Sequence, residues 1–218
     1  MTKGFDREKS LDRSEYFNDA YFSLPQLFSL SHQIHLIHSL NPENILEIGI
    51  GNGFVSNFLK SAGYRVTTAD INPRLKPDII APISDLRTKI KDRFDLVVCC
   101  EVLEHMPFEH FDENIKIISE IGTDCLITLP RYKRRWGFNG LIDLPKVPIR
   151  GFNINFSVPF YNKKLRNTSH FWEIGYNKKT TRDALVKQLK NNFDEVINGF
   201  FHLNPYHQYF VCKKSLNN

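Results

Sequence analysis

The amino-acid sequence predicts an α/β fold: a doubly wound, seven-stranded, mostly parallel sheet that ends in an antiparallel hairpin. Three observations lead to this prediction. Short apolar runs alternate with helical patterns between residues 44 and 130, a glycine-rich turn follows the first run, and two strand-like segments at 195–203 and 207–212 end the chain. The 218 residues are enough for a single domain, 1–218, with a full hydrophobic core.

The composition is that of a globular protein. Hydrophobic residues make up 41% and charged residues 24% of the chain, and no apolar stretch is long enough to span a bilayer. The residues after Met1 lack the apolar core of a signal peptide, so we expect a cytoplasmic protein without a membrane span. None of the four cysteines has the Cys-x-x-Cys spacing of a zinc ribbon. The net charge of +5 permits an anionic partner without requiring one.

The segment 1–40 predicts an N-terminal arm followed by a helix. Its first twenty residues are charged and show no period, so we expect a loose arm or short helix that folds over a bound ligand. From about residue 24 the apolar residues share one helical face. His32, His35 and His38 drift around this helix rather than converge, so we interpret them as a partly solvated face and not as a metal site.

A glycine-rich turn organises the chain. The apolar strand 44–48 contains Glu47 and is followed by Gly49, Gly51 and Gly53. Glycines at such a turn adopt positive φ without strain and let a ligand lie against bare backbone. The dinucleotide-binding fingerprint would need its third glycine one residue later, and the acid would repel a pyrophosphate. The spacing therefore favours a different nucleotide-like ligand.

Acidic residues also end two later strands. The strand 64–69 is closed by Asp70, nineteen residues after Gly51, where a carboxylate can accept hydrogen bonds from ribose hydroxyls. The strand 94–100 runs directly into Glu101. Because ligands bind outside the carboxyl ends of parallel strands, we expect these acids and the glycine turn to meet at one site.

These features resemble motif I and its surroundings in the class I S-adenosylmethionine (SAM)-dependent methyltransferases, which have a Rossmann-like fold. SAM carries a positive sulfonium and no pyrophosphate, which suits an acid beside the turn. In this family an acid after the third strand commonly contacts the adenine; here that position is Pro82, and Asp85 is the nearest acid that could replace it. The resemblance implies S-adenosyl-L-methionine as cofactor, held by Glu47, Gly49, Gly51, Gly53, Phe54, Asp70, Ile71, Asp85, Glu101 and Val102.

A second resemblance lies in residues 101–106, Glu-Val-Leu-Glu-His-Met. Methyltransferases of this class often carry Val-Leu-Glu-His after the fourth strand, beside the transferring methyl group. The C-terminal part resembles a bacterial and archaeal subgroup of undetermined substrate.

Methyl transfer is an in-line displacement that depends on alignment, and a base helps to remove the proton of a hydroxyl acceptor. We therefore expect O-methylation of a small-molecule or saccharide-type acceptor. His105 is the first candidate for the general base, since its ordinary pKa is near 6.5, and His170 is the second. Either histidine could instead have a packing role.

Two alternatives stay open. If residues 101–105 form one helical turn, Glu101, Glu104 and His105 lie on one side of it, and with His170 they resemble the metal site of the small-RNA terminal 2′-O-methyltransferases. Such ligands suit Mg²⁺, Mn²⁺ or Zn²⁺. The leading interpretation assigns no metal and treats a nucleic-acid acceptor as the less favoured partner. The second alternative is a non-catalytic module that keeps the fold and acts through its aromatic insertion.

That insertion covers residues 131–169, where the simple pattern breaks. A basic cluster at 131–136 is followed by alternating apolar residues between 152 and 160. Long insertions in compact domains are usually functional, and the family resemblance implies a substrate-binding insertion after the fifth strand. We predict a substrate lid; a solvated loop, a hairpin packed on the body and a dimer contact are the other interpretations.

Overall fold

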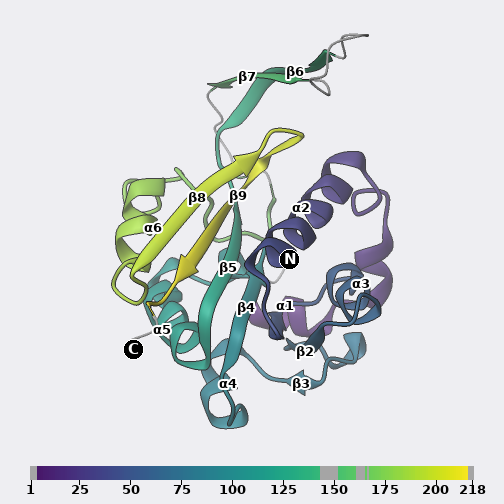
Figure 1. Cartoon of the computed structure of the whole chain (residues 1–218), viewed down its shortest axis with the longest axis vertical. Helices are drawn as coiled ribbons and strands as arrows, with labels where there is room; N and C mark the ends of the chain where they lie inside the picture. Colours follow the sequence, from purple (N-terminus) through teal and green to yellow (C-terminus); the bar gives the residue numbers. More distant parts are fainter. Residues whose placement is uncertain (1–3, 143–151, 161–164, 166, 216–218) are drawn as a thin grey trace.

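The computed structural model describes residues 4–142, 152–160, 165 and 167–215. Its body is a seven-stranded sheet with helices on both faces (Figure 1). The strands of this sheet are β1 (Asn44–Ile48), β2 (Arg65–Asp70), β3 (Ile79–Ile80), β4 (Phe94–Cys100), β5 (Gly122–Pro130), β8 (Glu195–Phe201) and β9 (Asn204–Lys213). The α-helices are α1 (Phe5–Ser10), α2 (Leu24–Leu40), α3 (Phe54–Ser61), α4 (Ile83–Lys89), α5 (Phe111–Ile121) and α6 (Arg182–Leu189). Short 3-10 helices are η1 (Arg13–Phe17), η2 (Pro73–Leu75), η3 (Leu103–His105) and η4 (Phe108–His110).

The strand order is β3-β2-β1-β4-β5-β9-β8. Strands β1 to β5 pair in parallel, β9 is antiparallel to β5, and β8 is antiparallel to β9. The chain runs outward from β1 in one direction and then returns to place β4 on its other side, so the order of the sheet reverses between β1 and β4. This confirms the predicted doubly wound sheet with its C-terminal antiparallel hairpin.

Alternate residues of the central strands feed two hydrophobic cores, because successive side chains of a strand point to opposite faces. Leu96 and Val98 of β4 pack in the core under α2 and α3, together with Ile37 and Leu59. Val97 and Cys99 belong to the core under α4, α5 and α6. The strands are therefore apolar on both faces, which is typical of a parallel sheet covered by helices on both sides.

Strand β5 begins at Gly122, directly after α5. A Cβ at this position would collide with Val97, so only a glycine lets the two strands approach so closely. The final hairpin differs from the sequence-based expectation, because it turns at residues 202–203 and Asn204 already belongs to β9. This shift leaves the topology unchanged.

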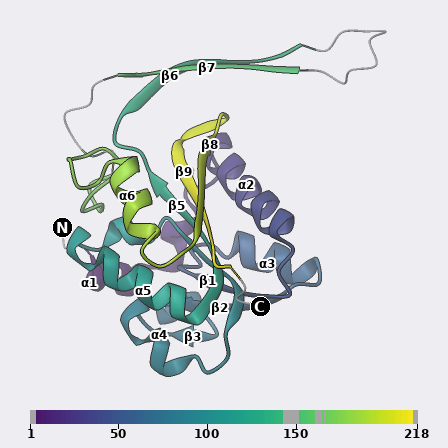
Figure 2. The ribbon, with the colours of Figure 1, turned by 60° about the vertical axis from the view of Figure 1, so that its left-hand side comes forward.

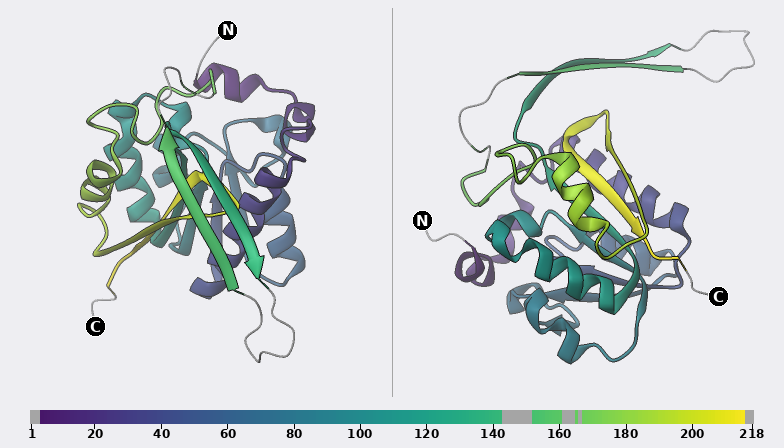
Figure 3. Two further views of the ribbon diagram at one scale, coloured as in Figure 1. Left: turned by 90° about the horizontal axis from the view of Figure 1, so that it is seen from above. Right: turned by 90° about the vertical axis from the view of Figure 1, so that its left-hand side faces the viewer.

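A second, two-stranded sheet consists of β6 (Arg134–Ile142) and β7 (Phe152–Phe160). These antiparallel strands form a long ribbon that stands away from the body (Figures 2 and 3). The ribbon lies within the predicted lid, whose residues 143–151, 161–164 and 166 fall outside the described part of the chain. Among the described residues, no helix has both the length and the hydropathy needed to cross a bilayer.

Candidate active site

The glycine turn after β1 has the expected backbone geometry. Gly49, Gly51 and Gly53 have φ values of 77°, 51° and 74°, in the left-handed region where glycine is unstrained. A Cβ at Gly49 would collide with Cγ2 of Val102, so the turn also lies too close to the end of β4 for a larger residue. The turn is tied to the sheet by the amide of Gly49, which donates to the carbonyl of Ala69 at 2.9 Å.

Asp70 fastens this turn to the end of β2. Its Oδ2 accepts a hydrogen bond from the amide of Ile50 at 2.9 Å, and its Oδ1 accepts one from the amide of Asn72 at 2.8 Å. Burial raises the pKa of Asp70 from its ordinary value, while these backbone hydrogen bonds act in the opposite direction. The carboxylate is thus oriented by backbone groups before any ligand arrives.

Glu47 is a buried acid, and its burial disfavours the ionised form of the carboxyl group. The residue is only 7% exposed, and its Oε2 has no hydrogen-bond partner among the described residues. Burial raises the pKa of Glu47 to about 7, although hydrogen bonding to Ser56 and the charge of Lys60 oppose this. A cationic ligand would relieve both the missing contact and the cost of ionisation.

A cavity of about 420 Å³ joins these groups. The predicted site residues among its lining are Glu47, Gly49, Gly51, Asp70, Ile71, Glu101, Val102 and His105. The N-terminal segment covers the same cavity and contributes Arg7, Glu8, Tyr16 and Tyr21. The sequence indicated an arm over the ligand, but without a period or motif it could not identify these four side chains.

Four predicted residues lie elsewhere. Gly53 is the residue before α3, and Phe54, which begins α3, is 39% exposed. Asp85, in the first turn of α4, accepts a hydrogen bond from Ser84 at 2.9 Å. The cavity is lined at this end by Ala81, Pro82 and Ile83 instead. His170 is buried behind the cavity wall, whereas its neighbour Ser169 lines it.

Glu101 is held from two sides. Its φ of 57° places a non-glycine residue in the left-handed region at the end of β4. Thr128 donates to Oε1 at 2.9 Å, and Nε2 of His207 lies 3.0 Å from Oε2. Burial by itself would raise the pKa of Glu101, but the charge and hydrogen bond of His207 lower it below its ordinary value. Nothing in the sequence pattern connected His207 with this site.

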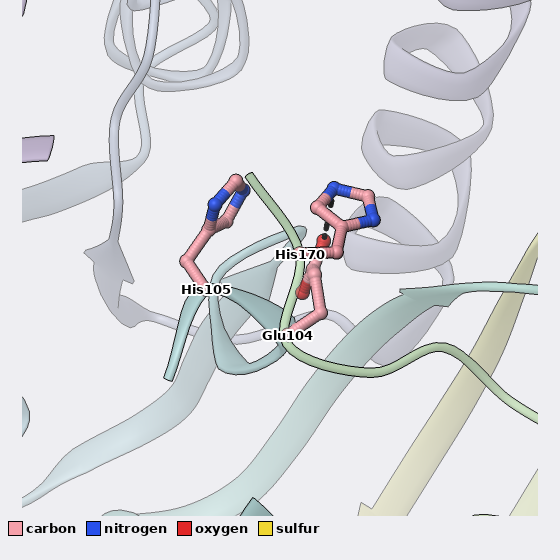
Figure 4. Close-up of side chains that lie close together, drawn as sticks. All are labelled: Glu104, His105 and His170. Atoms are coloured by element: carbon pink, nitrogen blue, oxygen red, sulfur yellow. Dashed lines mark ion pairs between the residues drawn. The ribbon is translucent and has the colours of Figure 1, made fainter. Parts of the chain in front are cut away.

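Glu104, His105 and His170 form a cluster beside the cavity (Figure 4). Each offers one ligand atom, and these atoms lie within 4.8 Å of one another. Nε2 of His170 is 4.0 Å from Oε1 of Glu104, and Nδ1 of His170 is 3.0 Å from Oε1 of Glu173. His170, which follows the insertion, therefore lies next to Glu104 and His105. The alternative metal prediction named these three residues together with Glu101.

The carboxyl group of Glu104 is fully buried, and neither oxygen receives a hydrogen bond from another described residue. Burial and the nearby acids Glu101, Glu173 and Glu8 raise its pKa well above the ordinary value. An unsatisfied buried carboxyl is costly, which makes it a natural place for a ligand.

His105 differs from the sequence-based expectation in its protonation. Burial, reinforced by the charge of His170, lowers the pKa of His105 to about 3, far below the value near 6.5 of a free imidazole. Its Nδ1 is 3.4 Å from Oε1 of Glu8, and its ring meets that of His170 edge-on at 5.0 Å between centroids. His105 is therefore a neutral imidazole, and its unprotonated ring nitrogen can accept a proton or a metal.

The fold and the site together define a class I SAM-dependent methyltransferase. A family model described as a methyltransferase domain matches residues 24–137, more than half of the chain. The chain belongs to this family, whose class uses S-adenosyl-L-methionine as cofactor. The alternative of a non-catalytic module is thereby set aside.

Curated relatives match only part of the chain. A ubiquinone biosynthesis O-methyltransferase from Bordetella bronchiseptica is 31% identical over 83 residues, which cover 32% of this chain and 34% of the relative. The enzyme of the same name from Bordetella avium is 30% identical over 86 residues. The matched part thus spans about a third of the length of these relatives.

Solved structures share the fold over nearly the whole chain. The N-methyltransferase NodS from Bradyrhizobium japonicum, in complex with S-adenosylhomocysteine (SAH), has a TM-score of 0.59 at 14% identity and covers 96% of this chain and 95% of its own. Magnesium protoporphyrin IX methyltransferase from Synechocystis, with bound SAH, has a TM-score of 0.58 at 15% identity. This match covers 96% of the present chain and 97% of the methyltransferase chain. The small RNA methyltransferase HEN1 has a TM-score of 0.58 at 15% identity and covers 87% of this chain and 25% of its own.

Proposed function

We propose that this enzyme transfers the methyl group of SAM to a hydroxyl oxygen of a small-molecule or saccharide-type acceptor. The observation that carries the proposal is that His105, a neutral imidazole, lines the same cavity as the glycine turn and Asp70. A cofactor held at the turn and an acceptor next to His105 would share one enclosed space, as in-line transfer requires.

Two comparisons support a hydroxyl acceptor. The partial sequence relatives are named O-methyltransferases. A structure with a TM-score of 0.52 and 13% identity, the N-terminal domain of EvdMO1, was solved with SAH and the sugar D-fucose. The name of the relatives and the sugar in the EvdMO1 structure are properties of those proteins, and they guide the choice of acceptors for the test.

In the proposed mechanism, the turn and Asp70 would hold the nucleoside end of SAM, and Glu47 would face its positive charge. The acceptor oxygen would form its bond to the methyl carbon as the bond from that carbon to the sulfonium sulfur breaks, and neutral SAH would leave. The oxygen becomes positive in this step, so its proton becomes strongly acidic. A neutral imidazole of low basicity can accept that proton at this stage, and Glu8, 3.4 Å from Nδ1, would stabilise the resulting charge. His105 would therefore act late, during or after methyl transfer, rather than by ionising the acceptor beforehand.

The test combines turnover with cofactor affinity. Wild-type enzyme and His105→Ala would be assayed with labelled SAM and a panel of phenols, catechols and sugars, and SAH affinity would be measured by calorimetry. We expect turnover of the variant to fall about 100-fold or more while SAH affinity stays within about threefold. His110→Ala, an exposed histidine outside the cavity, is the matched control. Unchanged turnover in His105→Ala would refute the role of this residue.

A metal-assisted RNA 2′-O-methyltransferase is the second candidate. The cluster of Glu104, His105 and His170 favours it, and the fold likeness to HEN1 is compatible with it. The fourth predicted ligand, Glu101, is not part of this cluster; its two oxygens contact Thr128 and His207. A divalent ion there would polarise the hydroxyls of a terminal ribose.

Thermal-shift titrations with MgCl₂, MnCl₂ and ZnCl₂ test the metal hypothesis directly. If the cluster binds an ion, the melting temperature of the wild-type enzyme should rise with metal concentration, and Glu104→Gln should abolish this rise while SAH still stabilises the variant. An RNA oligonucleotide with a free 3′ end would then be compared with the small acceptors. No metal response at any concentration would remove this candidate.

A further inference from the structure

Two polar side chains in the cavity wall have no task in the proposed mechanism. Gln33 on α2 is only 4% exposed, and its amide group makes no hydrogen bond to another described residue. Tyr21 of the N-terminal arm is half-buried, and its hydroxyl group also lacks such a bond to the described residues. Both residues line the cavity. A buried amide without a partner is costly, so a molecule bound in the cavity is the natural partner for Gln33.

Gln33 lies at the end of the cavity that contains Glu101. A second, small cavity of about 10 Å³ is lined by Gln33 together with Thr128 and His207, the two residues that orient Glu101. Because Gln33 lines both cavities, it forms part of the wall between them. Gln33 therefore lies beside the segment after β4, which also carries His105.

Tyr21 is held near the same segment. Burial and the negative charges of Glu8 and Glu101 raise the pKa of Tyr21 to about 12, so its hydroxyl group lies near these acids and stays protonated at neutral pH. The amide of Tyr21 donates to the carbonyl of Asn18 at 2.9 Å, and its ring meets that of Tyr16 edge-on at 5.7 Å between centroids. The arm thus holds a hydrogen-bond donor at the Glu101 end of the cavity.

The chemistry of this part of the wall suits hydroxyl groups. Gln26, Leu30 and Gln33 line the cavity at intervals of four and three, so they share one face of α2, and this face carries two amides and no charge. An amide both donates and accepts hydrogen bonds, and so does the hydroxyl group of Tyr21. A hydroxyl group of a bound molecule needs the same two kinds of partner, which a set of cations or carboxylates alone would not supply.

The charges of the cavity oppose an anionic acceptor. Among its described lining residues, Arg7 is the one cation, and it already pairs with Glu8. The acids of the lining are Glu8, Glu15, Glu47, Asp70 and Glu101. A carboxylate or phosphate group of an acceptor would meet like charges there, without an unpaired cation in the described lining to neutralise it.

We propose that Gln33 and Tyr21 form the acceptor subsite and select molecules that carry neighbouring hydroxyl groups and no negative charge. This inference rests on the proposed O-methylation and narrows its class of acceptor. Gln33 and Tyr21 would bind one hydroxyl group of the acceptor while the reacting hydroxyl group lies beside His105. The subsite would thereby align the acceptor oxygen with the methyl group, as in-line transfer requires.

Two matched pairs of probes test the subsite: D-galactose with D-galacturonic acid, and catechol with 3,4-dihydroxybenzoate. Within each pair the ring hydroxyl groups are the same, and the second probe adds a carboxylate. Affinities for the full chain saturated with SAH would be measured by ligand-observed NMR titration, and turnover of each probe with labelled SAM. We expect at least one neutral probe to bind, and its anionic counterpart to bind at least about tenfold more weakly.

Two substitutions then address the named residues. Gln33→Leu removes the amide at similar size and should weaken binding of the neutral probe at least about tenfold, and Tyr21→Phe, which removes only the hydroxyl group, at least about threefold. Both variants should keep the SAH affinity and the melting temperature of the wild type. Gln188→Leu is the matched control, because it changes a glutamine of α6 outside the cavity, and it should bind the probes like the wild type.

Three results would overturn the proposal: equal affinities within both pairs, a loss of SAH affinity in Gln33→Leu as large as its loss of probe affinity, or no binding of any of the four probes. Failure of the proposed O-methylation has a different signature. If a neutral probe binds through Gln33 but receives no methyl group, the subsite stands and the reaction is wrong. If a hydroxyl compound is methylated with the same KM in wild type and Gln33→Leu, the reaction stands and the subsite is wrong.

Discussion

His207 near the C-terminus fixes the carboxylate of Glu101 at the end of β4: its Nε2 lies 3.0 Å from Oε2. The other ring nitrogen, Nδ1, is 2.7 Å from the hydroxyl of Ser29 on α2. Thr128 on β5 donates to the second oxygen of Glu101 at 2.9 Å. Three elements that are distant in sequence therefore orient one acid at the edge of the cavity, and they hold it in a left-handed backbone conformation.

We expect His207→Ala to weaken SAM binding about tenfold, because Glu101 would lose a hydrogen bond to a charged group worth about 1.5 kcal/mol. His207→Gln, which can still donate to Oε2, should recover part of this affinity. Ser29→Ala is the control, since it removes only the outer contact and should cost less than about threefold. Calorimetry with SAM provides the measurement, and equal affinities for wild type and His207→Ala would contradict the assignment.

Asp70→Asn should lower SAM affinity at least about tenfold. The amide nitrogen that replaces one oxygen cannot accept, so the variant loses either the bond from Ile50 or the bond from Asn72, together with the charge at the ribose end. Asp78→Asn is the matched control. Asp78 accepts from the amide and hydroxyl of Thr68 at 2.8 Å and lies outside the cavity, so its loss should reduce stability and leave SAM affinity unchanged.

Glu47 should make stability and cofactor binding depend on pH in opposite directions. Its pKa is about 7 in the folded protein against an ordinary 4.5, so the folded state holds the extra proton between these values. Stability should therefore fall as pH rises from about 4.5 to about 7, by up to about 3 kcal/mol, and then level off. SAM affinity should rise over the upper part of this range, since the ionised acid faces the positive charge.

The variant Glu47→Gln separates the titration of Glu47 from that of the nearby Asp70. Urea unfolding and SAM calorimetry at about pH 5.5, 7 and 8.5 would be compared for both proteins. The variant should be more stable than wild type above pH 7, bind SAM more weakly there, and show a flatter pH dependence of both quantities. Identical pH profiles for the two proteins would show that Glu47 is not the titrating group.

Gly49→Ala should be markedly more destabilising than Gly63→Ala. Both residues have positive φ, 77° and 94°, which costs about 1–2 kcal/mol for an alanine. A Cβ at Gly63 meets nothing within 4 Å, whereas a Cβ at Gly49 collides with Val102 and should cost about 1–3 kcal/mol more. Urea unfolding measures both variants. Val102→Ala combined with Gly49→Ala should recover part of the difference, and strictly additive effects would argue against the contact.

The sequence predicted the parts of the candidate site that can be recognised from the order of neighbouring residue types. Strand β1, the glycine turn and the acid at Asp70 are all visible in the order of residue types, because strand and helix periods repeat within a few residues. It missed the arm residues Tyr16 and Tyr21, which carry no motif and reach the cavity only when the arm folds back. It also assigned His105 an ordinary pKa, because burial depends on neighbours that the local sequence does not specify.

The sequence by itself determined the fold class and the parallel sheet, which follow from hydrophobic periodicity and glycine spacing over short stretches of chain. The resemblance to the class I methyltransferases supplied the antiparallel C-terminal hairpin and the family of the cofactor turn. Only the tertiary structure decided that His170 meets Glu104, that His207 orients Glu101, and that β6 and β7 form a ribbon standing away from the body. Such contacts join residues far apart in sequence, and they depend on how whole elements pack rather than on any local preference.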